Sequence, residues 1–252
     1  MSNNARSGLL MKIKAKLICL ISILAVEVIL GRGFYLYLDQ WITKRQAVQQ
    51  TDSGGESGGH GKAAEPSPVK QVALTFDDGP HPVYTPRLLD GLRERGVHAT
   101  FFLIGNSIEG NEDIVRRMKE DGHLIGNHSN SHVQLTVESA KAACDEINAT
   151  NRKILEITGE EPQYIRPPFG SWSEELECMV PMTVVLWDID PLDWKVLNTR
   201  KVVRHILKNV DDNDIILLHD VYGTSVDAAL EVVDTLSKEG YTFVTVDELL
   251  ID

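Results

Sequence analysis

From residue 69 onward, the chain alternates short apolar runs of strand length with longer stretches of helical periodicity. The expected strands are 72–76, 99–104, 124–126, 164–166, 183–187, 215–218 and 242–244. The expected helices are 85–95, 113–121, 137–158, 173–179, 199–209, 226–238 and 246–250. Strands that alternate with helices are parallel and are joined by helical crossovers. Seven such strands predict an α/β fold, a closed or nearly closed (β/α) barrel, with an open doubly wound sheet as the alternative.

The first 68 residues differ in character from the rest. Several Lys and Arg residues precede an apolar stretch, residues 17–38, that is long enough to cross a bilayer as a helix, although Glu27 and Arg32 interrupt it. The absence of a clear small-residue cleavage site favours an uncleaved anchor over a cleaved export signal. Basic residues before such a span predict that the N-terminus lies in the cytoplasm and that the chain after the span lies on the outer side of the cell membrane. We therefore expect a cytoplasmic tip and membrane anchor or signal segment at 1–42, a Gly-, Ser- and Pro-rich flexible linker at 43–68 and one folded domain at 69–252.

The net charge of -12 is unevenly distributed along the 252 residues, because residues 69–252 are strongly acidic. An acidic domain argues against a nucleic-acid partner, which basic side chains would have to bind through its phosphates. No glycine-rich phosphate loop follows the first expected strand, so we expect no nucleotide cofactor. Cys144 and Cys178 could form one disulfide in an exported domain or remain two separate buried thiols, and Cys19 lies in the apolar stretch.

Polar motifs follow five of the expected strands, at the edge where (β/α) folds carry their active sites. They are Asp77-Asp78-Gly79-Pro80, His128-Ser129-Asn130-Ser131-His132, Arg166-Pro167-Pro168-Phe169-Gly170, Asp190-Pro191-Leu192-Asp193-Trp194 and His219-Asp220. Each motif alone could be a turn, a solvated pair or a rigid loop, but their recurrence at one end of the domain favours a shared site. On one helical turn, His128 and His132 would face the same way. With a carboxylate they could hold one ion and leave an open coordination position, as catalytic metal sites do.

With the blocks TFDDGP, HSNSH, RPPFG, DPLDW and LLHD in this order, residues 69–252 resemble the polysaccharide deacetylases of carbohydrate esterase family 4, the NodB-homology family. The sequence DPLDWK further resembles bacterial peptidoglycan N-acetylglucosamine deacetylases. The resemblance implies a distorted (β/α) barrel. It also implies a metal-dependent hydrolase that removes N-acetyl groups from N-acetylhexosamine residues of a polysaccharide, with peptidoglycan as the first expectation.

The resemblance also implies roles for single residues. Asp78, His128 and His132 would bind the metal ion, and Asp77 would be the general base, paired with Arg166. Adjacent strand residues point to opposite sides, so the two aspartates can take different tasks. The expected ion is Zn²⁺, with Co²⁺, Ni²⁺ or Mn²⁺ as alternatives.

On the opposite side of the expected site, His219 resembles the general acid, and Asp193 would keep it cationic and fix its tautomer. The backbone N–H of Phe169 would bind the oxyanion, and this use of the backbone makes the departure from the family's frequent Tyr at that position unimportant. The pocket for the acetyl methyl group would comprise Trp194, Leu217 and Pro168, for which ordinary packing is the alternative.

Other functions are open at the level of sequence. The chain could be a membrane-tethered glycan-binding protein without catalysis, or an amidohydrolase acting on a non-sugar amide. N-acetylmuramic acid residues and chitin oligomers are alternative substrates. Acetate release that depends on a divalent metal would separate catalysis from binding, and a panel of substrates would separate the two hydrolases.

Overall fold

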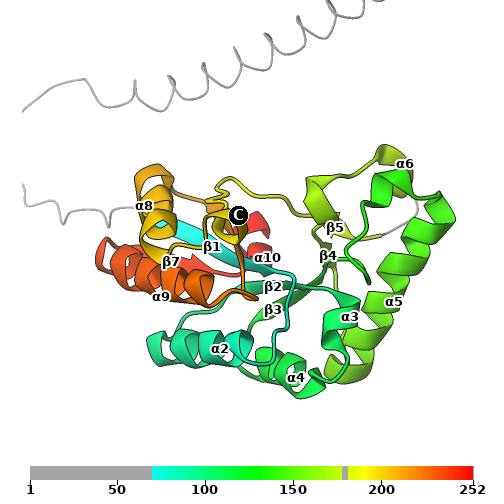
Figure 1. The fold of residues 1–252 in the computed structure, drawn as a ribbon, viewed down its shortest axis with the longest axis horizontal. Coiled ribbons are helices and arrows are strands. Elements are labelled where there is room, and N and C mark those ends of the chain that lie inside the picture. The colour runs from blue at the N-terminus through cyan, green and yellow to red at the C-terminus, as the bar shows by residue number, and fades with distance from the viewer. Residues whose placement is uncertain (1–69, 178–180, 252) are drawn as a thin grey trace, which may run out of the picture. The chain divides into compact units, whose positions relative to one another are not determined.

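The computed structural model describes residues 70–177 and 181–251, which form a parallel β-sheet with helices packed around it (Figure 1). The strands are β1 (Lys70–Asp77), β2 (Thr100–Leu103), β3 (Leu124–Asn127), β4 (Tyr164–Ile165), β5 (Thr183–Val184), β6 (Asp214–His219) and β7 (Tyr241–Val244). The longer helices are α2 (Tyr84–Arg95), α4 (Glu112–Glu120), α5 (Ala140–Thr158), α8 (Thr199–Asn209) and α9 (Gly223–Lys238). The short ones are α3 (Gly105–Ile108), η1 (Leu135–Val137), η2 (Pro168–Gly170), α6 (Glu174–Glu177), α7 (Asp193–Val196) and α10 (Val246–Ile251). All seven expected strands are therefore confirmed.

The order of the strands makes the sheet an α/β half-barrel. The path runs β5-β4-β3-β2-β1-β6, and β7 pairs with the first half of β1. β1 to β5 follow one another on one side of β1, and β6 lies on its other side, so a barrel differs from a doubly wound sheet here only if the two edges of the path approach each other. A single bridge between Ile189 and Ile216 spans the gap between the segment after β5 and β6.

The sheet is irregular at β4 and β5, which have two residues each. Pro167 and Pro168 follow β4 closely, and proline offers no N–H to a strand ladder. The prolines account for the early end of β4; β5 is also shorter than the sequence pattern predicted, and the sheet is distorted on this side.

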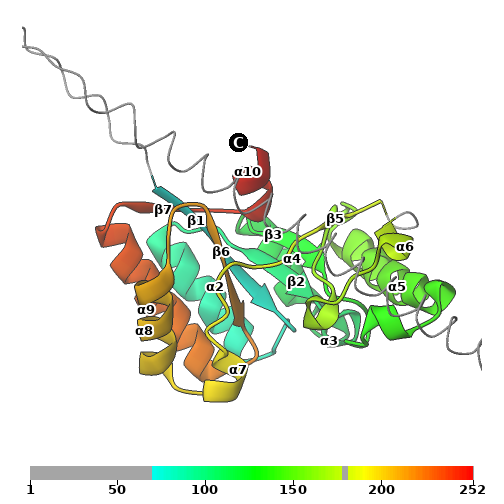
Figure 2. The same cartoon turned by 90° about the horizontal axis from the view of Figure 1, so that it is seen from above.

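The main hydrophobic core lies between the sheet and the helices that cover it (Figure 2). Leu74 and Phe76 of β1 contribute fully buried side chains, as do Leu88 of α2 and Val232 of α9. Burial on both faces is typical of central parallel strands. This packing holds the carboxyl end of β1 in a fixed place next to its neighbours.

Glycine ends two of the helices as expected. Gly96 caps α2 at φ 64°, and Gly159 caps α5 at φ 75°, in the left-handed region that glycine adopts without a steric penalty. The expected helix at 137–158 begins later, at Ala140, because the Ser139 hydroxyl accepts a hydrogen bond from the N–H of Ala142 and caps it there.

The predicted anchor at 1–42 and linker at 43–68 lie outside the described residues, as do Cys19 and Cys178. The possible disulfide of Cys144 is therefore not tested. Among the helices of residues 70–177 and 181–251, none combines the length and the apolar character needed to span a membrane.

Candidate active site

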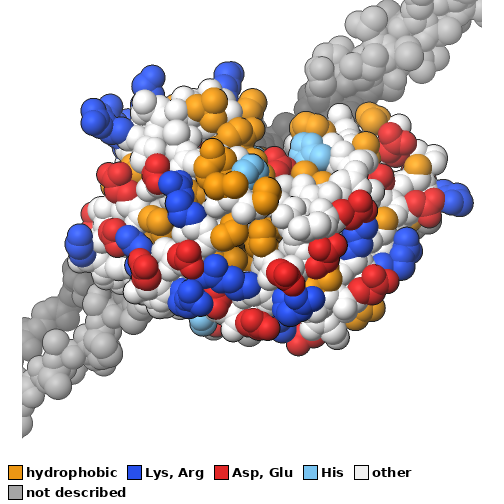
Figure 3. Space-filling view, turned by 60° about the horizontal axis from the view of Figure 1, so that its bottom comes forward, with side chains coloured by type: hydrophobic (Ala, Val, Ile, Leu, Met, Phe, Trp, Pro, Cys, Tyr) orange, Lys and Arg blue, Asp and Glu red, His pale blue; other side chains and the backbone are white. Residues whose placement is uncertain are grey.

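The carboxyl ends of β1, β3 and β6 surround a cavity of about 410 Å³. Its wall comprises Asp77, Asp78, His128, His132, Pro167, Phe169, Trp187, Asp190, Trp194, Leu217, His219 and Tyr222. In the space-filling view, histidine and apolar side chains gather on one face of the domain (Figure 3). Of the residues predicted for the site, all line this cavity except Arg166, Asp193 and Pro168.

Asp78, His128 and His132 converge at one point of the cavity. Asp78 Oδ1 lies 3.5 Å from Nε2 of His128 and 3.5 Å from Nε2 of His132, and one ligand atom from each residue lies within 4.8 Å of the others. The same Oδ1 is buried and has no hydrogen-bond partner among the described residues. A buried carboxylate oxygen without a partner is costly, whereas a cation between the three side chains would satisfy it. The donor set therefore fits a divalent metal ion with an open position.

The tautomer of His128 suits metal binding. Its Nδ1 lies 2.6 Å from the carbonyl oxygen of Arg166, which can only accept a hydrogen bond, so Nδ1 carries the proton. The lone pair of Nε2 then faces Asp78. Burial lowers the pKa of His128, which keeps the ring neutral. A backbone carbonyl that orients the far nitrogen in this way is the usual support of a metal-bound histidine.

The helical turn expected for the two histidines is wrong. The backbone runs as a loop in which Ser129 and His132 adopt φ 61° and φ 56°. The Asn127 side chain accepts a hydrogen bond from the N–H of Ser129 at 2.7 Å, and the Ser129 hydroxyl accepts one from the N–H of His132 at 3.0 Å. These local bonds compete with helix formation. The loop that they stabilise brings Nε2 of His128 and Nε2 of His132 to the same oxygen of Asp78.

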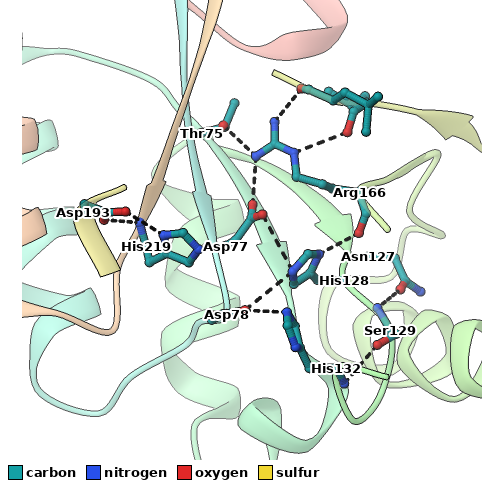
Figure 4. Close-up of polar contacts among 12 residues, drawn as sticks. Thr75, Asp77, Asp78, Asn127, His128, Ser129, His132, Arg166, Asp193 and His219 are labelled. Atoms are coloured by element: carbon teal, nitrogen blue, oxygen red, sulfur yellow. Dashed lines mark hydrogen bonds and ion pairs between the residues drawn. The ribbon is translucent and has the colours of Figure 1, made fainter. Parts of the chain in front are cut away.

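Asp77 and Asp78 take different partners, but the strand pleat alone does not separate them. Asp78 follows β1 with φ 74°, so the chain turns at this residue. Asp77, the last residue of β1, is 3% exposed and faces Arg166. Asp77 is also the register partner of His219 on β6, which sets these two side chains at adjacent strand ends (Figure 4).

Arg166 is fully buried behind Asp77, and each of its three guanidinium nitrogens donates at least one hydrogen bond. It donates to Asp77 Oδ1 at 2.8 Å and to the Thr75 hydroxyl at 2.7 Å. Two backbone carbonyls after β5 accept its remaining bonds, and the group lies 4.3 Å from the ring centroid of Phe102. Burial lowers the pKa of Arg166, and the charge of Asp77 opposes this effect. The ion pair fixes Oδ1 of Asp77, and the other oxygen, Oδ2, lies 3.7 Å from Nε2 of His128.

His219 forms a second buried pair with Asp193. The Nδ1 of His219 lies 2.8 Å from Asp193 Oδ1, and its backbone N–H donates to Asp193 Oδ2 at 2.9 Å. Asp193, at the start of α7, is 0% exposed. Burial lowers the pKa of His219, but the hydrogen bond and charge of Asp193, with the charges of Asp77 and Asp78, raise it to about 9. The imidazole of His219 is therefore held in its cationic form. Of the two ring nitrogens, Asp193 contacts only Nδ1, so it does not occupy Nε2.

Phe169 lies in η2 with φ 61°, and its exposed ring packs edge-on against His132 with the centroids 4.7 Å apart. The pocket prediction differs from the structure at Pro168. Pro168 begins the η2 turn and is not part of the wall of the cavity, whereas its neighbour Pro167, also buried, is.

The apolar wall is larger than the sequence indicated. Trp194, 46% exposed, and the buried Leu217 line the cavity as predicted from the motifs. Trp187 and Tyr222 also line it but were missed. Trp187 could have been found, since it follows the β5 region as the other site residues follow their strands. No sequence pattern marks Tyr222, which lies in the loop between β6 and α9.

A model of the family described as "Polysaccharide deacetylase" matches residues 64–180. The peptidoglycan-N-acetylmuramic acid deacetylase PdaC of Bacillus subtilis is 43% identical over 180 residues, 71% of this chain and 38% of PdaC. The peptidoglycan-N-acetylglucosamine deacetylase PgdA of Listeria monocytogenes is 37% identical over 71% of this chain and 39% of its own length. A peptidoglycan-N-acetylglucosamine deacetylase of Bacillus cereus is 37% identical over 73% of this chain and 90% of its own length. The chain thus spans less than two fifths of PdaC and PgdA.

Solved structures agree with these relatives. The structure of PdaC superposes with a TM-score of 0.71 at 43% identity, covering 72% of this chain and 90% of that one. A family 4 acetyl xylan esterase from Clostridium thermocellum, solved with a cobalt ion, has a TM-score of 0.69 at 36% identity, covering 72% and 91%.

Proposed function

Because the chain belongs to the polysaccharide deacetylase family, we propose that it is a metal-dependent hydrolase that removes N-acetyl groups from N-acetylhexosamine residues of a polysaccharide. One observation carries the proposal. The Asp78–His128–His132 cluster lies in the same cavity as two further titratable groups, Asp77 and His219, that are each oriented by a buried partner. A glycan-binding protein without catalysis would have no use for this arrangement.

We propose that Asp78, His128 and His132 hold the metal ion. The bound ion would polarise the acetamide carbonyl and lower the pKa of a water molecule toward about 7. Two neutral imidazoles and one carboxylate suit Zn²⁺, with Co²⁺, Ni²⁺ and Mn²⁺ as alternatives. The cobalt ion in the related Clostridium thermocellum esterase supports a transition metal of this kind.

Asp77 is the proposed general base. One of its oxygens is fixed by Arg166 and the other lies 3.7 Å from Nε2 of His128, next to the metal cluster. It takes the proton of the water that attacks the acetyl carbonyl carbon. The backbone N–H of Phe169 is the proposed donor to the oxyanion, which is supported by the place of this residue in the wall of the cavity. Loss of one such donor typically costs about 3–4 kcal/mol of transition-state stabilisation.

His219 is the proposed general acid. The C–N bond breaks readily only when the leaving amine is protonated, and a cationic imidazole supplies that proton. Asp193 occupies Nδ1 and raises the pKa of His219, after the opposing effect of burial, to about 9. The proton therefore leaves from Nε2, and the products are acetate and the free amino sugar.

We infer that the polysaccharide is peptidoglycan, because the relatives at 34–43% identity with assigned activities include deacetylases of its N-acetylglucosamine and N-acetylmuramic acid residues. Chitin oligomers are the alternative. Residues 1–42 are proposed to anchor the enzyme with its domain outside the membrane, or to be cleaved so that it is secreted. The linker at 43–68 would give a reach of about 25–30 Å into the wall.

Acetate release tests the function. The purified chain is incubated with peptidoglycan or chitin oligomers after loading with Zn²⁺, Co²⁺, Ni²⁺ or Mn²⁺. We expect metal-dependent acetate from peptidoglycan, and mass spectrometry of the digested glycan identifies the sugar that has lost its acetyl group. Binding of oligomers without acetate under every metal would favour the glycan-binding function instead.

A further inference from the structure

The buried carboxyl group of Asp220 has no role in the reaction proposed above. Asp220 follows His219 directly after β6 and is 0% exposed. Its Oδ2 accepts a hydrogen bond from the hydroxyl of Thr85, and its Oδ1 is buried with no partner among the described residues. Burying a carboxyl group with an unpaired oxygen is unfavourable, so its presence beside the site needs a physical reason.

Gly79 packs directly on this carboxyl group. A Cβ atom built on Gly79 would lie 2.4 Å from Oδ1 and 2.5 Å from Oδ2 of Asp220, closer than any real contact. Gly79 follows the proposed base Asp77 and the proposed metal ligand Asp78 in the chain. The carboxyl group of Asp220 therefore lies against the turn that carries both of them, and only a residue without a side chain fits between.

Thr85 connects the far end of the same turn to Asp220. Its hydroxyl accepts a hydrogen bond from the N–H of His81 at 2.7 Å while it donates to Asp220. Burial raises the pKa of Asp220 to about 7, against the effect of the Thr85 hydrogen bond. Near neutral pH the carboxyl group of Asp220 is therefore not fully ionised. Its shape and its hydrogen bond to Thr85, rather than its charge, are the features on which its role depends.

The strand ladder explains why such a support is needed. β1 and β6 are paired up to Asp77 and His219, and the ladder ends there. Asp78 lies beyond the ladder, after a left-handed turn. Beyond this point the turn is held on the β2 side by the hydrogen bond that the N–H of Ile104 donates to the carbonyl of Gly79 at 3.1 Å, and on the β6 side by the contact with Asp220.

We propose that Asp220 is a positioning residue that, through Thr85 and Gly79, fixes the turn of Asp78 relative to the end of β6. The metal ligand and the base are thereby held at a set distance from the general acid. The catalytic part of this inference rests on the proposed function, whereas its effect on metal binding does not.

Three variants and one control test the proposal. Thr85→Val removes the hydroxyl and keeps the shape, Asp220→Ala removes the carboxyl group, and Asp220→Asn keeps both its shape and an acceptor for Thr85. Thr100→Val is the matched control, because the hydroxyl of the buried Thr100 also accepts a hydrogen bond from a backbone N–H, that of Val246, at the start of β2 and outside the wall of the cavity. The measurements are the dissociation constant of Co²⁺ by visible absorption, kcat and KM for acetate release, and unfolding by urea.

We expect Thr85→Val and Asp220→Ala to weaken Co²⁺ binding about 10-fold and to lower kcat about 10–100-fold, the range for residues that orient metal ligands. KM should change little, since neither side chain lines the cavity. Asp220→Asn should stay within about threefold of wild type, and Thr100→Val should lose stability without a change in metal affinity or kcat.

Two outcomes would overturn the inference. Thr85→Val could keep both its Co²⁺ affinity and its kcat, or Asp220→Asn could fail as badly as Asp220→Ala. If Asp220→Ala does not fold, Thr85→Val still decides. If the wild type releases no acetate with any metal, the proposed function fails, but the Co²⁺ affinities of the variants still test the positioning role.

A double-mutant cycle tests the contact itself. Gly79→Ala should destabilise the domain strongly, because its Cβ would collide with the carboxyl group of Asp220. In the Asp220→Ala background the same change should be much less harmful, since the colliding atoms are gone. Equal effects of Gly79→Ala in both backgrounds would contradict the contact.

Discussion

Replacement of Asp193 by Asn should shift the pH dependence of the reaction. Asp193 is the leading favourable cause of the raised pKa of His219, which reaches about 9 against an ordinary value of 6.5. Burial lowers this pKa, so without the carboxylate we expect it to fall to 6.5 or below. The difference of about 2.5 units corresponds to about 3.4 kcal/mol between the two protonation states of the imidazole.

The size of the kinetic effect follows from the fraction of His219 that carries its proton. At pH 8, a pKa of about 9 leaves about nine tenths of the imidazole protonated, and a pKa of 6.5 leaves about 3%, a loss of about 30-fold. The alkaline limb of kcat/KM should therefore move from near pH 9 to near pH 6.5 in Asp193→Asn. The Asn side chain can also favour the wrong tautomer, which would lower the rate further at every pH.

The assay is a pH–rate profile of acetate release, with the ring signals of His219 followed by NMR titration. Asp188→Asn is the control, because Asp188 also accepts a backbone N–H, that of Ile215, but does not line the cavity. Its profile should match that of the wild type. An alkaline limb in Asp193→Asn within about half a unit of the wild type would refute the assignment of His219 as an acid held protonated by Asp193.

Three further predictions concern the neighbouring groups. Asp77→Asn should lower kcat about 10²–10⁴-fold, because the general base is lost, with the metal ion retained on elemental analysis. Arg166→Met should cost about 3–5 kcal/mol in urea unfolding, because it leaves a buried carboxylate without its partner; a loss below about 1 kcal/mol would contradict the buried pair. Burial lowers the pKa of His123 to about 4, below its unfolded value of 6.5, so the unfolded state binds the proton first as pH falls. The free energy of unfolding should then drop by about 3 kcal/mol from pH 6.5 to 4, and His123→Gln should remove this slope.

The sequence was sufficient to predict the strands and the polar residues that follow their carboxyl ends. β1 and β6 are short apolar runs whose sequence pattern indicates strands rather than helices. Parallel strands place their carboxyl ends at the same edge of the sheet. The meeting of Asp77 with His219 therefore follows from the strand pattern once β1 and β6 are neighbours. The motif blocks supplied the rest of the candidate residues.

The local geometry could not be predicted in the same way. The loop of His128 to His132 depends on hydrogen bonds that the side chains of Asn127 and Ser129 accept from backbone N–H groups. A spacing of four residues between two histidines does not distinguish this loop from a helical turn. The left-handed turn at Asp78 is likewise a product of packing, since the backbone there fits against Asp220 across a glycine. The contact between Gly79 and Asp220 joins residues far apart in the chain and leaves no periodic trace in the sequence.

The central claim is that Asp78, His128 and His132 hold one metal ion while Asp77 acts on the substrate beside it. Titration of the metal-free protein with Co²⁺ tests it most directly, with wild type, Asp78→Asn and Asp77→Asn compared under identical conditions. We predict one ion per chain in the wild type, a loss of affinity of at least about 100-fold in Asp78→Asn, and near-normal affinity without acetate release in Asp77→Asn. Unchanged binding in Asp78→Asn, or full acetate release by Asp77→Asn, would contradict the account.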